Sequence, residues 1–187
     1  MYKNKKILAI VMARGGSKGI KYKNLRKING NSLISISAKL LKKIKIIDKS
    51  IISSDNESII KESTKFGLKK LFKRPDFLSG DIVSDYDVMK HALISAERID
   101  KTKYHLVLMI QPTSPLRQAK HITDCIKLFF KKKDTTSVWS VSKVDTKFHP
   151  MKILEKKDSF LKYYHSKGPK IIARQQLDEK YFRKWQI

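Results

Sequence analysis

The sequence has one cysteine, seven glycines and five prolines in 187 residues, and it contains no long hydrophobic run. A single thiol, Cys125, excludes an internal disulfide framework, and its place in an apolar helical pattern predicts a buried side chain. The first apolar run, 7–13, ends at Arg14 and is too short for a membrane span or a secretion signal. We therefore expect a cytoplasmic protein with a single domain over 1–187.

Acidic residues are also scarce, because 17 Asp and Glu stand against 42 Lys and Arg, which gives a net charge of +25. Such a charge attracts anions and raises the possibility of a nucleic-acid partner. However, 35 of the basic residues are lysines and only 7 are arginines, whereas proteins that read polynucleotides favour the bidentate arginine. We favour a solvated lysine surface and keep a basic nucleic-acid-binding protein as an alternative.

Hydrophobic patterning predicts an alternation of strands and helices. Short runs rich in Ile, Val and Leu predict buried strands at 7–13, 50–54, 69–72, 105–110 and 137–141. Apolar residues at helical spacing predict helices over 33–44, 88–99 and 122–129. A further helix is expected between an Asn56 cap and Gly67. This order predicts an α/β fold with a mainly parallel sheet.

Polar residues follow the predicted strands at their carboxyl ends, where parallel sheets bind ligands. Arg14 follows the first strand, Asp55 the second, Arg74 the third and 111–117 the fourth. Asp55 could serve a ligand or cap the next helix, and we favour the cap. After residue 142 the alternation weakens, and the charged stretch 143–168 is expected to leave the sheet as an arm or lid.

The stretch AIVMARGGSKGIKYKN places three glycines among basic residues directly after the first predicted strand. Glycines let backbone N–H groups approach an anion, and Arg and Lys supply positive charge, so this position favours a phosphate-binding loop over a plain surface turn. The two common nucleotide fingerprints, G-x-x-x-x-G-K-[ST] and G-x-G-x-x-G, are absent.

Six motifs occur in a fixed order: ARGGSKGIKYKN, SSD, RPDFLSGD, QPTSPLR, KFHPMK and RQQL. In this order the sequence resembles the acylneuraminate cytidylyltransferases, which include the CMP-sialic, CMP-legionaminic and CMP-pseudaminic acid synthetases. The resemblance implies a Rossmann-like, three-layer nucleotidyltransferase fold. It also implies transfer of a cytidylyl group from CTP to a nine-carbon keto-sugar acid, with release of pyrophosphate and assistance from Mg²⁺.

The resemblance assigns roles to residues of this sequence. Arg14 and Lys23 would be catalytic, Gln111, Arg174 and Arg183 would bind the sugar acid, and Arg117 would fix its loop. The nucleotide would be bound by Arg14, Gly15, Gly16, Ser17, Lys18, Lys23, Asn24, Arg74, Asp81 and Ser84. Asp85 stands where relatives often carry serine, so that contact is not expected here.

Family members use the segment at 143–170 as a dimerisation arm, so the resemblance implies a homodimer. Their pattern then continues through an Arg-x-Asn-Gly step to two aspartates that hold Mg²⁺, whereas this sequence has Trp185 at the expected asparagine. We therefore expect this chain to lack the last strands and the metal-binding segment, and we name no metal ligand. Our hypothesis for Trp185 is that the gene lost one adenine from an A-rich tract. AAA-AAT-GG would then read AAA-TGG, which encodes Lys-Trp, and resequencing the gene tests this. The alternative to an active enzyme is a catalytically silent CTP-binding or dimerisation module.

Overall fold

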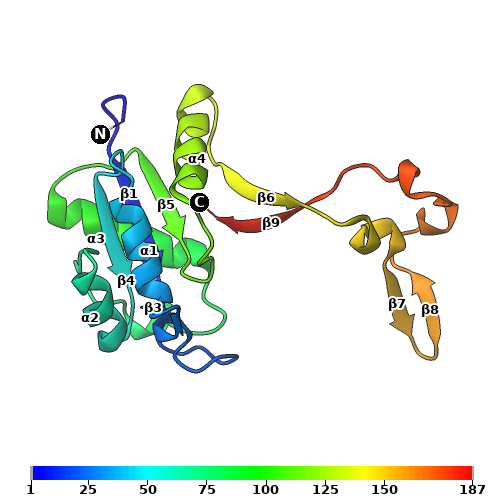
Figure 1. Cartoon of the computed structure of the whole chain (residues 1–187), viewed down its shortest axis with the longest axis horizontal. Helices are drawn as coiled ribbons and strands as arrows, with labels where there is room; N and C mark the ends of the chain where they lie inside the picture. Colours follow the sequence, from blue (N-terminus) through cyan, green and yellow to red (C-terminus); the bar gives the residue numbers. More distant parts are fainter. Residues whose placement is uncertain (1, 187) are drawn as a thin grey trace. The chain divides into compact units, whose positions relative to one another are not determined.

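A computed structural model of the chain describes residues 2–186 (Figure 1). The chain divides into two compact units: the first runs up to Val138 and includes Gln186, and the second covers Trp139–Trp185. The arm expected at 143–170 falls inside the second unit. Its role as an arm and the single-domain assignment stay predictions.

A three-stranded parallel sheet forms the centre of the first unit. It contains β1 (Ile7–Met12), β4 (Lys49–Ser53) and β5 (Leu106–Ile110), in the order β4-β1-β5. Ile10 on β1 lies opposite Ile51 on one side and Met109 on the other. The central strand is buried on both faces, which its continuous apolar run predicts. The predicted α/β architecture with a mainly parallel sheet is confirmed.

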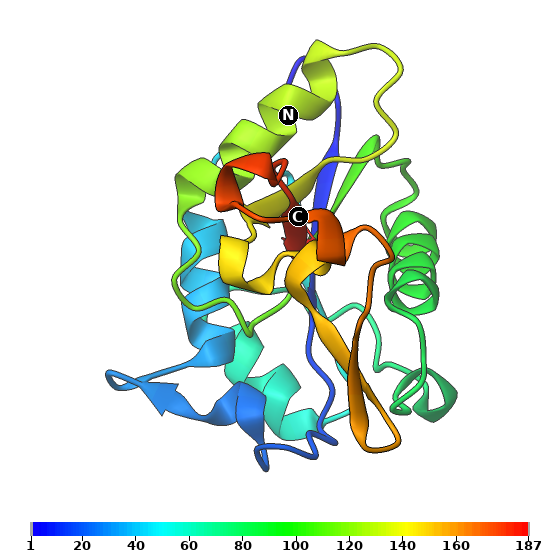
Figure 2. The same cartoon turned by 90° about the vertical axis from the view of Figure 1, so that its right-hand side faces the viewer.

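Helices cover both faces of this sheet, which gives three layers (Figure 2). One face packs against α1 (Leu33–Lys42), α2 (Glu57–Lys65) and α4 (Ala119–Lys131), and the other against α3 (Asp85–Asp100). Side chains alternate across a strand, so the odd-numbered residues of β1 join the first core and Leu8 and Ile10 join the second.

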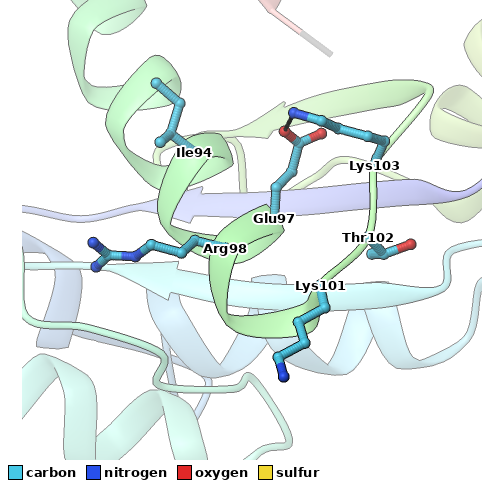
Figure 3. Close-up of a pocket in the computed structure, with 6 residues that line it drawn as sticks. All are labelled: Ile94, Glu97, Arg98, Lys101, Thr102 and Lys103. Atoms are coloured by element: carbon cyan, nitrogen blue, oxygen red, sulfur yellow. Dashed lines mark hydrogen bonds and ion pairs between the residues drawn. The ribbon is translucent and has the colours of Figure 1, made fainter.

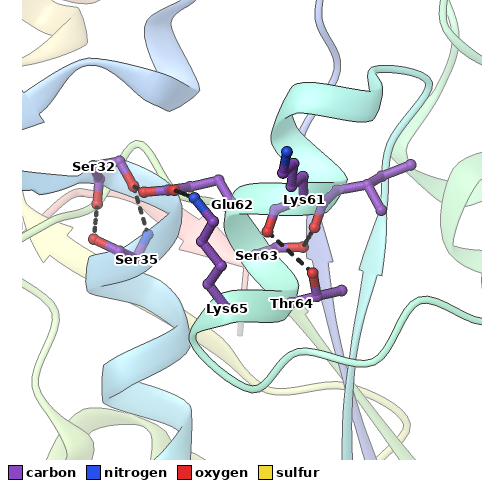
Figure 4. Close-up of polar contacts among 8 residues, drawn as sticks. Ser32, Ser35, Lys61, Glu62, Ser63, Thr64 and Lys65 are labelled. Carbon is purple, nitrogen blue, oxygen red and sulfur yellow. Dashed lines mark hydrogen bonds and ion pairs between the residues drawn. The ribbon is translucent and has the colours of Figure 1, made fainter.

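A polar cap starts α1, and Figure 4 shows its contacts with Ser35 and with Glu62 on α2. The Ser32 hydroxyl accepts the N–H of Ser35 at 3.0 Å and donates to Glu62 on α2 at 2.8 Å, which links α1 to α2. Asn56 caps α2, and Gly67 follows its end with φ +99°, a conformation that favours glycine. The sequence predicted that this helix begins after Asn56 and ends at Gly67, and the prediction is confirmed.

Two predicted strands do not join the parallel sheet. Over 69–72 the chain forms a single parallel bridge, between Lys69 and Ile51, and it meets the end of β4 again where the Arg74 N–H donates to the carbonyl of Ser54 at 2.9 Å. The strand predicted at 137–141 is β6 (Trp139–Lys143) in the second unit, where it pairs with β9 (Tyr181–Gln186). Its residues are exposed or half-buried, unlike those of a strand covered on both faces.

The second unit also holds an antiparallel hairpin of β7 (Leu154–Lys157) and β8 (Phe160–Tyr163), whose strand residues are all exposed. The sequence predicted an irregular segment here and missed this hairpin. The remaining short elements are the antiparallel pair β2 (Lys27–Ile28) and β3 (Asn31–Ser32), and the 3₁₀ helices η1 (Lys23–Leu25), η2 (Asp76–Leu78), η3 (Thr146–Phe148), η4 (Pro150–Lys152), η5 (Gly168–Lys170) and η6 (Arg174–Gln176).

Within residues 2–186, none of the helices is both long enough and apolar enough to cross a lipid bilayer. Cys125 on α4 is half-buried rather than fully buried, and burial raises the pKa of its thiol. The helix turns this residue toward the rim of the core, where Ile122 and Ile126 occupy the buried positions.

Candidate functional site

The candidate site lies at the carboxyl edge of the parallel sheet, around residues 14–19, which we call the basic loop. The loop leaves β1 directly. The link from β4 to α2, the segment 74–84 and the end of β5 reach the same edge. Parallel strands bring their carboxyl ends together, so four segments that are distant in sequence meet here.

The peptide group between Arg14 and Gly15, the first of the basic loop, has both its carbonyl and its N–H hydrogen-bonded. Asp55, from the link after β4, accepts the Gly15 N–H at 2.9 Å. Asn24, from η1, donates its side-chain N–H to the Arg14 carbonyl at 3.0 Å. The predicted cap role of Asp55 is wrong, because Asn56 caps α2 and leaves the Asp55 carboxylate for the loop.

Gly15 is required by packing, because a Cβ at this position would lie 2.9 Å from the Cβ of Asn56. A Cβ on Gly16 would meet no atom within 4 Å. The Ser17 N–H donates to the Gly15 carbonyl at 3.0 Å, which tightens the turn. In the part of the chain that the structure describes, the N–H groups of Gly16 and Lys18 have no partner, so both can serve an anion.

A carboxylate from another segment already forms ion pairs with the basic side chains of this loop. The Arg14 guanidinium contacts Asp81 at 2.8 Å and donates to the Gly80 carbonyl at 2.7 Å. The Lys18 ammonium pairs with the same Asp81 carboxylate. Hydrogen bonding from Lys18, with a contribution from Arg14, holds the pKa of the Asp81 carboxyl below its usual value. Arg14 and Lys18 therefore converge on one anionic group.

Arg74 is a buried arginine beside this loop, with 5% of its surface exposed. It donates to the hydroxyl of Ser53 at 3.0 Å and to the carbonyl of the same residue at 2.6 Å. Burial lowers its pKa to about 10, the Asp55 charge opposes that shift, and the Arg14 charge adds to it. The Arg74 guanidinium thus fixes the end of β4 and adds positive charge to the edge.

Ser84 and Gln111 belong to a second polar group on the same edge. The Ser84 hydroxyl caps α3 by accepting the Asp87 N–H at 3.1 Å, and it donates to the Asp87 carboxylate at 2.6 Å. The Gln111 amide donates to Asp85 at 3.1 Å. Asp85, the residue that departs from the family pattern, therefore already accepts a hydrogen bond from the side-chain N–H of Gln111.

The structure brings most of the predicted site residues to one edge of the first unit. Lys23 and Asn24 lie on η1, and the Oδ1 atom of Asn24 is buried without a partner among the described residues. Arg174 lies on η6, in the second unit. The side chain of Arg183 lies outside the described residues. The binding roles of all these residues stay predictions.

A hollow on the opposite, amino-terminal edge does not resemble a nucleotide site (Figure 3). Its carboxylate, Glu97, already pairs with the Lys103 ammonium at 2.7 Å and accepts the Tyr104 N–H at 2.9 Å. The hollow lacks a glycine-rich turn. The residues that line it are Ile94, Glu97, Arg98, Lys101, Thr102 and Lys103.

The carboxylates of the site do not form a metal centre by themselves. Across residues 2–186 there is no group of three or more His, Cys, Asp or Glu side chains that could hold a metal ion. Asp55, Asp81 and Asp85 each accept a hydrogen bond or ion pair from a different partner. The described residues thus contain no such cluster for the Mg²⁺ that the resemblance implies, and that metal stays a prediction.

Comparison with known proteins shows similarity over nearly the whole chain. The family model for cytidylyltransferases matches residues 8–187. A post-translational flagellin modification protein B from Campylobacter coli is 33% identical over 72% of this chain and 57% of that protein. A CMP-N,N'-diacetyllegionaminic acid synthase from Campylobacter jejuni is 35% identical over 58% of this chain and 46% of that protein. The chain thus spans about half the length of these curated relatives.

Solved structures show the same fold at low sequence identity. A CMP:2-keto-3-deoxy-manno-octonic acid synthetase complexed with CTP has a TM-score of 0.61 and 16% identity, over 76% of this chain and 54% of that chain. A 4-diphosphocytidyl-2C-methyl-D-erythritol synthase has a TM-score of 0.62 and 10% identity, over 84% of this chain and 67% of that chain. At these identities the likeness supports the fold alone.

Proposed function

We propose that this chain, which belongs to the cytidylyltransferase family, is the CTP-binding part of an enzyme that activates nine-carbon keto-sugar acids in the cytoplasm. In this reaction the anomeric hydroxyl oxygen forms a bond to the α-phosphorus of CTP. The bond from that phosphorus to the bridging oxygen breaks, pyrophosphate leaves, and the hydroxyl proton passes to solvent. Relatives named for legionaminic acid, N-acylneuraminate and pseudaminic acid support this substrate class.

The observation that carries the proposal is the pairing of Asp81 with both Arg14 and Lys18. A carboxylate held by a guanidinium and an ammonium beside unpartnered backbone N–H groups marks an anion site. The triphosphate of CTP would take the place of this carboxylate. Arg14 and Lys23 would then stabilise the charge that develops as pyrophosphate leaves, a role that depends on position and charge.

Mg²⁺ remains part of the proposal for the whole enzyme, because bound divalent metal neutralises charge on transferring phosphates. No cluster of carboxylates among the described residues fits it, so we assign no step to the metal.

We further propose that the second unit contains the dimerisation arm. The β7–β8 hairpin exposes 71% of Phe160 and 67% of Leu161. An isolated two-stranded hairpin is marginally stable in water, so exposed apolar side chains on it favour a covering partner. A second copy of this chain is the partner that the resemblance implies.

The direct test is pyrophosphate release from CTP, measured with purified chain and separate sialic, legionaminic and pseudaminic acids. Release with one acid supports the enzyme, and CTP binding without release supports the silent binding module. Arg14→Ala should weaken CTP binding roughly tenfold to a hundredfold, because charge-assisted contacts to phosphate are lost. Arg98→Ala, on the opposite edge, is the matched control. Equal CTP affinity in both variants, or none in the unmodified chain, refutes the proposal.

A further inference from the structure

Two side chains from different segments hold the two polar atoms of a single peptide group. The Arg14 carbonyl and the Gly15 N–H belong to the same peptide bond, and Asn24 and Asp55 bind them at 3.0 Å and 2.9 Å. We propose that Asp55 and Asn24 are positioning residues that lock this peptide plane and so set the basic loop for a phosphate ligand. This inference rests on the proposed function.

The lock matters because a glycine follows the arginine. Gly15 has a wider choice of backbone conformations than other residues, so the turn needs an external restraint to keep one geometry. With its N–H occupied by Asp55, Gly15 cannot also donate to phosphate. The N–H groups of Gly16 and Lys18 remain for the ligand, and the hydrogen bond from the Ser17 N–H to the Gly15 carbonyl extends the restraint from the locked plane into the turn.

Asp55 has a second possible role, as a counter-charge for the buried Arg74 guanidinium, whose pKa it raises. The two roles predict different behaviour for Asp55→Asn. An asparagine keeps an oxygen that accepts the Gly15 N–H but removes the negative charge. A positioning residue therefore tolerates Asp55→Asn and not Asp55→Ala, whereas a counter-charge tolerates neither.

The sequence allows this peptide to be observed alone, because Arg14–Gly15 is the single Arg-Gly pair in the chain. Labelling with carbonyl-¹³C arginine and ¹⁵N glycine gives one cross-peak in an NMR experiment that correlates each amide with the preceding carbonyl. Its hydrogen exchange reports the Gly15 N–H, and its carbonyl shift reports the Arg14 oxygen. Calorimetry with CTP and with inorganic tripolyphosphate then measures the effect on anion binding.

We expect the Gly15 amide to be protected in the unmodified chain and in Asp55→Asn, and to exchange at least roughly fivefold faster in Asp55→Ala. Asp55→Ala should bind tripolyphosphate roughly fivefold to tenfold more weakly. Asp55→Asn should bind it as tightly or more tightly, because a negative charge near the loop is gone. Asn24→Ala should shift the Arg14 carbonyl signal. Glu57→Ala, which removes an exposed carboxylate two residues after Asp55, is the control.

Equal exchange in the unmodified chain and Asp55→Ala overturns the lock, and so does unchanged tripolyphosphate affinity in Asp55→Ala. If Asp55→Ala does not fold, the isosteric variant Asp55→Asn provides the test. Loss of either Gly15 amide protection or tripolyphosphate affinity in that variant overturns the inference. Tripolyphosphate binding that follows the expected pattern without any preference for CTP over ATP refutes the proposed function and supports the lock. Binding of neither anion refutes both.

Discussion

Replacing Asp81 with asparagine tests whether this carboxylate occupies the place of a phosphate. In the structure Asp81 neutralises Arg14 and Lys18, which are two of the basic side chains predicted to bind the nucleotide. CTP must therefore displace an anion that is already bound. Asparagine has the same shape without the charge, so Asp81→Asn should bind CTP more tightly than the unmodified chain.

The exposure of the two ion pairs sets the size of the expected gain. The Lys18 side chain is 82% exposed, so its pair is strongly screened, whereas the Arg14 side chain is 32% exposed and contacts Asp81 at 2.8 Å. Exposed ion pairs stabilise proteins weakly, and removal of the one carboxylate that forms both pairs should tighten CTP binding by roughly threefold to tenfold. The gain should shrink as salt is raised, because added ions screen both pairs.

Calorimetric titration with CTP at low and high salt provides the measurement. Asp76→Asn is the matched control, because Asp76 is an exposed carboxylate of the same segment and has no ion pair among the described residues. If Asp81→Asn binds CTP no more tightly than Asp76→Asn, the competition argument is wrong. Weaker binding would instead favour the direct nucleotide contact that the family resemblance implies for Asp81.

Three further changes test the packing of the site and of the second unit. Gly15→Ala should lower the free energy of unfolding by about 1–3 kcal/mol, because its Cβ would overlap Asn56. Gly16→Ala, which meets no atom within 4 Å, should leave that free energy unchanged. Denaturant titration measures both variants, and equal free energies contradict the packing argument. Ser53→Ala should cost about 1–3 kcal/mol in the same assay, because the buried Nε–H of Arg74 loses its hydroxyl partner while the bond to the Ser53 carbonyl remains, and no loss would exclude that role. Substituting serine for both Phe160 and Leu161 should lower the mass measured by light scattering to that of a monomer, and a monomeric unmodified chain contradicts the dimer.

The parallel sheet was predictable because its strands carry short apolar runs, which are continuous in β1 and β5 and limited to Ile51 and Ile52 in β4. The runs at 7–13, 50–54 and 105–110 became β1, β4 and β5 within a residue at most boundaries. The run at 137–141, which contains two valines, a tryptophan and two serines, forms a partly exposed strand, because its partner is β9 rather than a neighbour in the central sheet. Strand pairing of this kind depends on distant residues, which periodicity does not report.

The site was predictable as an edge of the sheet but not as a set of contacts. The position of Arg14 after β1 located the loop, since strand ends identify the edge. The partner of Asp55 was missed, because a local cap and a distant N–H compete for one carboxylate and sequence favours the local partner. The Gln111 contact with Asp85 likewise depends on how the end of β5 meets the start of α3.

The acidic residues of this chain identify the site better than its net charge does. The 42 basic residues are spread over the whole sequence, so the net charge of +25 indicates that the protein attracts anions but not where they bind. Acidic residues number only 17, and three of them meet at the carboxyl edge of one sheet. Asp55 holds the turn of the loop, Asp81 holds its cations, and Asp85 holds the amide of Gln111. In a chain with so few carboxylates, their convergence on groups that could serve a nucleotide and a sugar acid points to a polar edge whose donors are arranged in advance of its ligands, since each donor already has a fixed direction.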